Sequence, residues 1–218
     1  MKAGPPFAER TLADLLNAFA ANTPVPGGGS AAALAGAAGV ALLMMVAGLP
    51  KTRTGAATES AALRAAAVRL RLLRDALTTL IDRDADAYSS VMTALRLPKA
   101  DQAQAAVRRH AFESAMRGAT EAPLDTMRAC RQALGEAIIV AAQGAASAAS
   151  DVGVAIELLR AAVRGAAMNV DANLSSLKAA PEVDRARAAR SQLAAESAAD
   201  AERGLALLAD ALPGADRP

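Results

Sequence analysis

The feature that most constrains this chain is a long segment without charge, residues 30–49, which directly follows a proline- and glycine-rich turn. The segment is about as long as a membrane-spanning helix, so it must lie either in a protein core or in a membrane. It consists mostly of alanine and glycine, which favour membrane insertion less than leucine or isoleucine but let neighbouring helices approach closely. We therefore predict a buried central helix and keep a membrane span as the alternative.

The turn before this helix reads TPVPGGGS over residues 23–30. Three consecutive glycines allow a ligand or another backbone to come against the main chain. The first turn of the helix has free N–H groups and a partial positive charge, which suit an anion or a carbonyl oxygen. The simpler alternative is a tight turn that caps a buried helix, with Ser30 as the N-cap.

The composition predicts an all-α fold. Hydrophobic residues make up 53% of the chain but aromatic residues only 2%, and the excess is alanine. Alanine favours helices, and few of the residues favour strands. The length of 218 residues suits one domain, and no repeat or linker divides the chain. We expect a single-domain multi-helix bundle over residues 1–218, with frayed ends at about 1–8 and 213–218.

The charged and sulfur-containing residues narrow the classes of function. The net charge is only +2, and the arginines are spread among acids, which argues against nucleic acid as a partner. The single cysteine, Cys130, excludes a disulfide within the chain. Met1 to Arg10 contains prolines and a glutamate where a signal peptide needs an apolar stretch, so we expect a cytoplasmic protein. The one histidine, His110, cannot build a histidine metal site, and we expect it at the surface.

Capping and breaking signals place the helix ends. Thr11 and Ser150 are the expected N-caps of the helices that follow them. Pro98 ends one long helix, and Pro123 is expected to begin a separate one. Pro181 begins a final helix that lies on the surface or in a dimer contact. The predicted helices cover about residues 12–21, 30–49, 59–97, 102–118, 124–143, 151–170 and 181–212.

The sharpest signal for a functional residue is Asp84. Apolar residues recur every three or four positions from Leu70 to Leu95, and Asp84 fills the gap in this stripe between Leu80 and Tyr88. A carboxylate aimed into an apolar interior must be paired, hydrogen-bonded or protonated. Such a group can donate and accept protons near neutral pH. The alternatives are a buried ion pair with an arginine, or a helix kink that turns Asp84 outward.

Other polar residues give less specific signals. Asp82 falls on the side of its helix away from the apolar stripe. Asn169 and Asn173 lie one helical turn apart, and they either bind the hydrogen-bonding edge of a ligand or tie to a neighbouring helix end. Lys51 and Arg53, in the turn after the central helix, either meet an acidic ligand or are solvated, and we favour solvation.

Four motifs, in order over nearly the whole chain, together resemble the folate cyclodeaminase family. That family includes the cyclodeaminase half of formiminotransferase-cyclodeaminase and the small stand-alone methenyltetrahydrofolate cyclohydrolases. Each motif alone is weak, but four in sequence are specific. The motifs are the turn Pro24-x-Pro26-Gly27-Gly28-Gly29-Ser30, Asp82-x-Asp84-Ala85 followed by Leu97-Pro98-Lys99, Ser150-Asp151-Val152-Gly153-Val154-Ala155, and Gly165-Ala166 with Asn169-Val170-x-x-Asn173.

The resemblance implies an all-helical subunit that forms a homodimer and binds a reduced folate near the glycine turn. In the reaction that it implies, either 5-formimidoyltetrahydrofolate closes to 5,10-methenyltetrahydrofolate with loss of ammonia, or water opens the methenyl bridge. Asp84 matches the family's proton-transferring aspartate. No metal is implied, and no cofactor beyond the tetrahydrofolate that carries the substrate. The residues expected to bind substrate are Pro26, Gly27, Gly28, Gly29, Ser30, Ser150, Asp151, Asn169 and Asn173.

The sequence departs from the family pattern at two places. Ala145 stands where the family usually has an asparagine after Gly144, and residues 51–54 read KTRT where the family usually has Gly-Lys and a tyrosine. Both changes affect expected substrate contacts, so the alternative function is a helical dimer that binds folate or a partner without catalysis. Deamination and hydrolysis share a compound, and the sequence does not separate them. A separate formiminotransferase chain is a further candidate partner.

Overall fold

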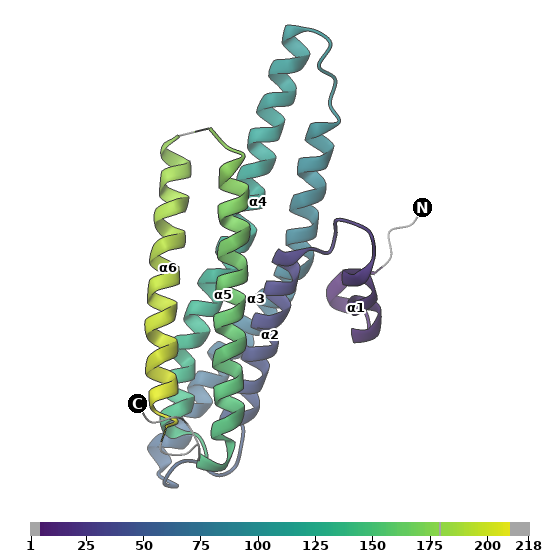
Figure 1. Cartoon of the computed structure of the whole chain (residues 1–218). Coiled ribbons are helices and arrows are strands. Elements are labelled where there is room, and N and C mark those ends of the chain that lie inside the picture. Colours follow the sequence, from purple (N-terminus) through teal and green to yellow (C-terminus); the bar gives the residue numbers. More distant parts are fainter. Residues whose placement is uncertain (1–4, 179, 210–218) are drawn as a thin grey trace.

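The computed structural model describes residues 5–178 and 180–209, and in these residues the regular structure is helical (Figure 1). An isolated antiparallel bridge also pairs Thr52 with Gly144. The predicted all-α fold is therefore confirmed. The helices are η1 (Phe7–Glu9), α1 (Leu12–Ala20), α2 (Gly28–Ala47), α3 (Ala57–Leu95), α4 (Gln102–Gln143), η2 (Ala146–Ala148), α5 (Ala149–Ser175) and α6 (Pro181–Ala206).

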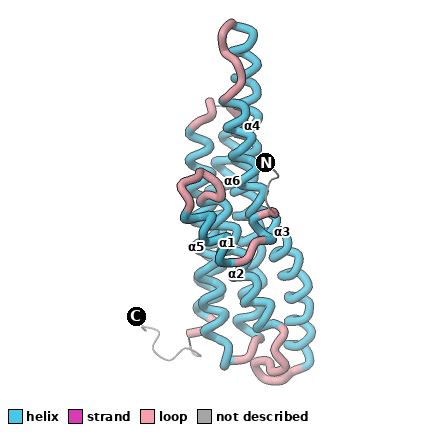
Figure 2. The backbone as a smooth tube through the Cα atoms, turned by 90° about the vertical axis from the view of Figure 1, so that its right-hand side faces the viewer, coloured by secondary structure: helices cyan, strands magenta, loops and turns pink. Residues whose placement is uncertain are grey.

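Four of the long helices form a bundle, and another lies against one side of it. α2 packs beside α3 and α5, α4 packs beside the same two helices, and α6 lies against α4 and α5. Short connections make successive long helices antiparallel (Figure 1). The hairpin of α3 and α4 reaches beyond the other helices, as Figure 2 shows. α2 is shorter than α3 and α5, the two helices beside which it packs.

The central helix lies in the bundle, as predicted, but only one side of it is buried. Val40, Leu43 and Val46 of α2 are completely buried. The glycines of this helix permit close packing, because a Cβ atom on Gly36 would lie 2.7 Å from the Cys130 Sγ atom, and one on Gly39 would lie 2.9 Å from a backbone oxygen of α5. α2 is long and apolar enough to cross a membrane, but 56% of its apolar window is buried inside the bundle.

The predicted helix break at Pro123 is wrong, because α4 continues through this residue from Gln102 to Gln143. A proline inside a helix has no N–H to donate to the carbonyl four residues earlier, here that of Ala119. The Asn173 Nδ2 atom of α5 donates to the Ala119 oxygen instead, at 2.8 Å. A side chain from a neighbouring helix thus replaces the missing hydrogen bond and allows the helix to continue.

Two predicted N-caps are also wrong. α2 begins one turn early, so that Gly27 is its N-cap and Ser30 lies inside the first turn. α5 follows directly on the η2 turn, so that Ala148 is its N-cap and Ser150 lies inside the helix. The Thr11 cap is confirmed, because its hydroxyl oxygen accepts from the Asp14 N–H at 3.2 Å. α6 ends at Ala206, earlier than predicted.

The N-terminal residues are more fixed than expected. The backbone N–H groups of Phe7 and Ala8 donate to the two carboxylate oxygens of Asp82, at 2.6 and 3.0 Å. The fraying predicted for residues 1–8 therefore does not extend to residues 7 and 8. The C-terminal residues 213–218 lie outside the described part of the chain.

The turn after α2 is held by Arg53. Its backbone N–H donates to the Gln143 oxygen at 2.8 Å, and its guanidinium donates to the Ala141 oxygen at 2.6 Å. Because the last carbonyls of a helix lack partners within the helix, Arg53 caps the C-terminus of α4. The favoured expectation of a solvated side chain is wrong for Arg53, whereas Lys51 is exposed.

Candidate active site

Asp84 lies on α3 at the level where α2 begins. The Ser30 N–H donates to the Asp84 Oδ2 atom at 2.9 Å, and the Ser30 hydroxyl oxygen lies 3.1 Å from the same atom. The carboxyl group is half-buried. The prediction that Asp84 points inward is confirmed, because its carboxylate meets the first turn of a buried helix.

Gly29 allows this approach. A methyl group at Gly29 would overlap the carboxylate of Asp84. Any other residue at this position would therefore move the carboxylate or the start of α2. The glycine turn does permit a close approach to the main chain, but the group that approaches is the Asp84 carboxylate of the same chain and not the ligand or second backbone that we expected.

The apolar stripe around Asp84 is less completely buried on one side of it. Leu77 and Leu80 lie in the core, whereas beyond Asp84 Val91 is buried against Met116 and Ala119 of α4 but Tyr88 and Leu95 are 39% and 38% exposed. α3 continues past Asp84 to Leu95, about 16 Å at 1.5 Å per residue. α2 begins at the level of Asp84 and does not run beside this part of α3. Asp84 therefore lies at the border between the packed core and a part of α3 that α2 does not cover.

Burial raises the pKa of Asp84 above its ordinary value, although the two hydrogen bonds from Ser30 act in the opposite direction. Among the described residues no arginine, lysine or histidine forms an ion pair with this carboxyl group. The alternative of a buried ion pair with arginine is therefore wrong. A carboxyl group that is partly desolvated and has no cationic partner is suited to take up and release a proton.

Ser30 can serve both protonation states of Asp84. Its hydroxyl oxygen lies 2.7 Å from the Ile81 carbonyl oxygen and 3.1 Å from the Asp84 Oδ2 atom. The hydroxyl has one hydrogen, so it donates to only one of these two acceptors at a time. When it donates to Ile81, its lone pairs can accept the proton of a neutral Asp84, and the Ser30 N–H serves the ionised form.

The two asparagines have different positions. The Asn169 amide lies 3.5 Å from the place that a Cβ atom on Gly28 would occupy, and its Nδ2 atom donates to the Gly165 oxygen at 2.9 Å. Asn169 therefore lies beside the glycine turn. Asn173 instead ties α5 to α4 through Ala119, which resembles the structural alternative considered for this pair except that the acceptor lies in the interior of α4 and not at a helix end.

The structure gathers only part of the predicted site within one chain. Gly27 is the N-cap of α2, and Pro26, joined to Val25 by a cis peptide bond, is buried beside it. Ser150 and Asp151 lie at the far end of α5, about 28 Å along the helix axis from Asn169. Their predicted role in substrate binding remains a prediction, and they do not reach Asp84 of the same chain.

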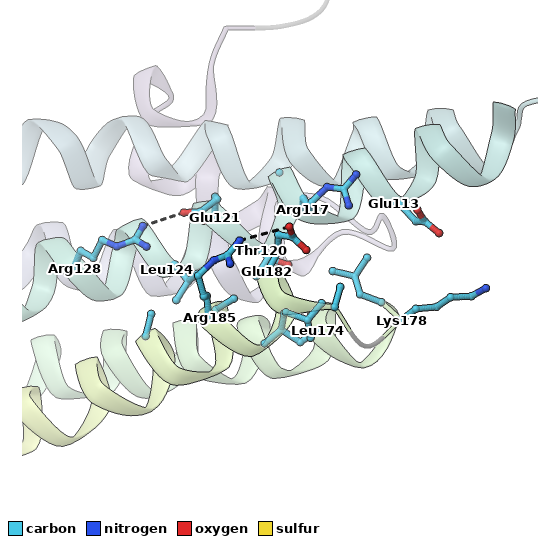
Figure 3. Close-up of a pocket in the computed structure, with 16 residues that line it drawn as sticks. Glu113, Arg117, Thr120, Glu121, Leu124, Arg128, Leu174, Lys178, Glu182 and Arg185 are labelled. Atoms are coloured by element: carbon cyan, nitrogen blue, oxygen red, sulfur yellow. Dashed lines mark hydrogen bonds and ion pairs between the residues drawn. The ribbon is translucent and has the colours of Figure 1, made fainter. Parts of the chain in front are cut away.

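A large cavity in the described part of the chain lies away from Asp84. A cavity of about 650 Å³ lies between α4, α5 and α6, and Figure 3 shows the side chains around it. Its charged residues are partly paired with one another, because Arg128 binds Glu121 and Arg185 binds Glu182. Asp84 and residues 26–30 line neither this cavity nor the three others of 400 to 560 Å³. The hollow expected beside the glycine turn is thus none of these four cavities.

Sequence reasoning missed two groups at this site. The Ile81 carbonyl, which competes for the Ser30 hydroxyl, has no signal in the sequence because it is a main-chain atom. Asp82 was expected to project away from the core, and nothing indicated that it binds the N-terminal segment. Among the described residues, no three His, Cys, Asp or Glu side chains converge as metal ligands do.

The chain is similar to known proteins over most of its length. The sequence profile of the family described as formiminotransferase-cyclodeaminase matches residues 11–195. A methenyltetrahydrofolate cyclohydrolase of Methylorubrum extorquens is 37% identical over 167 residues, which cover 77% of this chain and 80% of that protein. The formimidoyltransferase-cyclodeaminases of Rattus norvegicus and Gallus gallus are 32% and 28% identical, over 78% and 91% of this chain. The chain spans about a third of these two animal proteins, 32% and 36% of their lengths.

A solved structure has the same fold. The crystal structure of a formiminotetrahydrofolate cyclodeaminase from Thermotoga maritima superimposes with a TM-score of 0.77 and 23% identity, covering 94% of this chain and 97% of that one. At this identity the likeness shows a shared fold. The family profile covers the glycine turn, Asp84 and Asn169, and from this profile and the 37% identical relative it follows that this chain belongs to the formiminotransferase-cyclodeaminase family.

Proposed function

We propose that the protein is an enzyme that acts on reduced folates at the bridge between N5 and N10, with Asp84 as the residue that moves the proton. The observation that carries the proposal is a half-buried carboxyl group, without a cationic partner, held by Ser30 at the open end of the central helix. The names and similarity of the relatives support the substrate class.

Of the two reactions in this family, we propose hydrolysis of 5,10-methenyltetrahydrofolate. The relative with 37% identity bears the name of that hydrolase, and the chain covers 80% of it. The cyclodeaminase reaction is the second candidate, because relatives of that name match up to 91% of this chain. Both reactions need one group that accepts a proton and later returns one, so the same carboxyl group serves either.

In hydrolysis, the oxygen of a water molecule attacks the carbon of the methenyl bridge while the ionised Asp84 takes a proton from this water. The resulting tetrahedral carbon then breaks its bond to N5, and the protonated Asp84 returns the proton to that nitrogen. The hydroxyl group that came from the water then loses its proton and becomes the formyl oxygen. The products are 10-formyltetrahydrofolate and a free proton. A general base and acid in this position typically contributes about 10²–10⁴-fold to the rate.

In cyclodeamination, Asp84 transfers the proton in the reaction that forms 5,10-methenyltetrahydrofolate, which is the substrate of hydrolysis. N10 attacks the carbon of the protonated formimidoyl group on N5, Asp84 accepts the proton from N10, and the neutral Asp84 donates it to the departing amine. Ammonia leaves, and the methenyl bridge is formed. The single hydrogen of the Ser30 hydroxyl, which can turn toward Ile81 or toward Asp84, suits a group that changes its protonation state during the reaction.

The start of α2 and Asn169 position the substrate in this proposal. Gly28 is exposed at the first turn of α2, where backbone N–H groups have no partner within the helix. Its N–H can donate a hydrogen bond to the oxygen that attacks the methenyl carbon and becomes the formyl oxygen. Asn169, beside Gly28, offers hydrogen bonds to the folate. We propose no metal and no cofactor beyond the folate itself, and a cytoplasmic location.

The experiment is to follow the methenyl chromophore with purified protein. We expect the absorbance of 5,10-methenyltetrahydrofolate to fall faster than in buffer alone, and we expect it to rise from 5-formimidoyltetrahydrofolate if deamination also occurs. No change above background with either compound would contradict an enzyme. Binding of folate by calorimetry without turnover would instead support the non-catalytic alternative that Ala145 motivates.

A further inference from the structure

The cavity between α4, α5 and α6, which we name the α4/α5/α6 cavity, has no part in the proposed reaction. Its volume of about 650 Å³ lies within the roughly 300 to 1,000 Å³ that small-molecule sites usually have. Neither Asp84 nor the glycine turn lines it, and it is built from other helices than α2 and α3 (Figure 3). The cavity is therefore a separate place on the molecule, and its lining can be considered by itself.

The floor of the α4/α5/α6 cavity is apolar. Each of the three helices contributes one buried side chain to it: Leu124 of α4, Leu174 of α5 and Val183 of α6. Thr120 is the one buried polar residue in the lining, and its hydroxyl group donates to the Met116 carbonyl oxygen at 2.8 Å. A floor with few free polar groups offers water little to bind, so it suits the apolar part of a ligand.

Small residues leave the cavity open. α6 lines it with Ala186 and Ala189, whose side chains end at the Cβ atom, and α4 contributes Gly118. A Cβ atom on Gly118 would meet no other atom within 4 Å. One turn further along α6, Leu193 packs against the core instead. The space between α4 and α6 therefore follows from the small side chains at this level.

Two ion pairs lie at the edge of the cavity. Arg128 binds Glu121 at 3.0 Å, and Arg185 binds Glu182 at 3.5 Å, as the dashed lines in Figure 3 show. All four side chains keep at least 40% of their area exposed, so each pair is solvated and holds its partners only weakly. These four charges compensate one another, and the preference for a ligand depends on the other charged residues of the lining.

Those other residues are Arg117, Lys178 and Glu113. In the part of the chain that the structure describes, none of the three takes part in an ion pair. Two cations against one acid leave a surplus of one positive charge, which favours an anion. Arginine and lysine form their strongest hydrogen bonds with oxyanions such as carboxylates.

We propose that the α4/α5/α6 cavity is a second ligand site, which binds a small amphipathic anion. The apolar body of the ligand lies against Leu124, Leu174 and Val183, and its single carboxylate or similar oxyanion lies at Arg117 and Lys178. The ligand carries one negative charge rather than several, because the surplus charge of the lining is one. The site goes beyond the folate chemistry and does not depend on it, since no residue of the proposed active site lines the cavity.

A fluorescent probe of this chemistry tests for the site. 1-Anilinonaphthalene-8-sulfonate has an apolar aromatic body and one sulfonate group, and the chain contributes little emission of its own because it has no tryptophan and a single tyrosine. We expect saturable binding to the folded wild type, with about one probe per chain. Decanoate should displace the probe. Decylammonium, which has the same alkyl chain and the opposite charge, should displace it about tenfold less well.

Variants that fill the cavity test where the probe binds. We expect the double variant Ala186→Leu with Ala189→Leu to bind the probe about tenfold more weakly, because the new side chains occupy the space of the apolar body. Its circular dichroism should equal that of the wild type, and urea unfolding should show no loss of stability, since the leucines enter empty space. Ala188→Leu, at an exposed position on the same helix, is the matched control and should bind as the wild type does.

Charge variants test the position of the oxyanion. Arg117→Gln and Lys178→Gln change exposed side chains, so the fold should be retained. Each should weaken displacement by decanoate about threefold or more and leave displacement by uncharged decan-1-ol unchanged. Arg109→Gln is the matched control, because Arg109 is an exposed arginine of α4 that does not line the cavity.

Three results would overturn the second site. They are the absence of saturable probe binding to the folded wild type, equal binding by the filled double variant, and equal displacement by decanoate and decylammonium. No folate enters these measurements. A protein that turns over neither folate would therefore disprove the proposed function and leave the test of the second site intact.

Discussion

Asp82 and Asp84 are both carboxylates on α3, and both accept hydrogen bonds from backbone N–H groups at the start of another helix. They differ in what surrounds them. Asp82 holds η1, a short turn with no buried residue, whereas Asp84 holds the turn that contains the completely buried Ser30. The same type of side chain, two positions apart, is an N-terminal clamp in one place and a candidate proton carrier in the other. The difference teaches that the chemistry of an acid depends on the burial of its partners more than on its own motif.

The largest expected effect separates these two carboxylates directly. Asp84→Asn should lower kcat/KM by about 10²–10⁴-fold, because an amide cannot accept and return the proton. Asp82→Asn should leave kcat/KM nearly unchanged, because it touches only the N-terminal segment. Rates of methenyl hydrolysis with both variants measure the contrast. Equal losses in the two variants would remove the distinction.

The second effect concerns the room that Gly29 leaves for Asp84. Gly29→Ala would overlap the carboxylate, and overpacking of this kind costs about 1–3 kcal/mol of unfolding free energy. Activity should fall as well, because the carboxylate is displaced. Gly118→Ala on α4 is the matched control, since a Cβ atom there meets nothing within 4 Å and alanine is the better helix former. Urea unfolding of both variants should show a loss for Gly29 and none for Gly118.

The third effect sharpens the comparison with a second pair of like residues, Asn169 and Asn173. Asn173→Ala should cost about 1–3 kcal/mol, because it leaves the Ala119 carbonyl without its donor. In a Pro123→Ala background the cost should be smaller, since the new N–H of residue 123 can bond to that carbonyl. A double-mutant cycle by chemical denaturation measures the coupling. An equal cost in both backgrounds would contradict the account of α4.

The variant that loses stability should not be the variant that loses activity. Asn173→Ala should be the less stable protein, and Asn169→Ala should be the less active one. Asn169→Ala should raise KM, because Asn169 lies beside Gly28, whereas Asn173→Ala should leave KM and kcat close to their wild-type values. Steady-state kinetics on the two purified variants provides the test. A larger rise in KM for Asn173→Ala than for Asn169→Ala would indicate that the substrate binds nearer to α4.

The smallest effect is the pH dependence of stability. Because the folded pKa of Asp84 is raised by burial, the folded protein holds more protons than the unfolded chain between the two pKa values, and stability falls as pH rises through this window. Asp84→Asn should therefore be more stable than wild type at pH 7. The advantage should shrink as pH falls through the folded pKa toward the ordinary value of 3.8. Thermal unfolding of both proteins over this range measures it.

Composition was enough to predict the all-α bundle, the long uncharged segment to predict the central helix, and hydrophobic periodicity to predict the inward direction of Asp84. The proline rule failed at Pro123, because the donor that replaces the missing N–H comes from Asn173, which is distant in sequence. The capping signals failed at Ser30 and Ser150, since helix ends are set by tertiary packing around the turns. Tyr88 and Leu95 belong to an apolar stripe but are exposed, because α2 does not extend to their level. No sequence pattern shows where the covering helix stops.

The most direct test of the central claim is a titration of the Asp84 carboxyl carbon by NMR, with kcat/KM for methenyl hydrolysis measured over the same pH range. We expect a single Asp84 midpoint above the ordinary 3.8, absent in Asp84→Asn, and a change in kcat/KM with the same midpoint. A carboxyl group that titrates at or below 3.8, or a rate that stays constant through its titration, would contradict the role of Asp84 as the proton carrier.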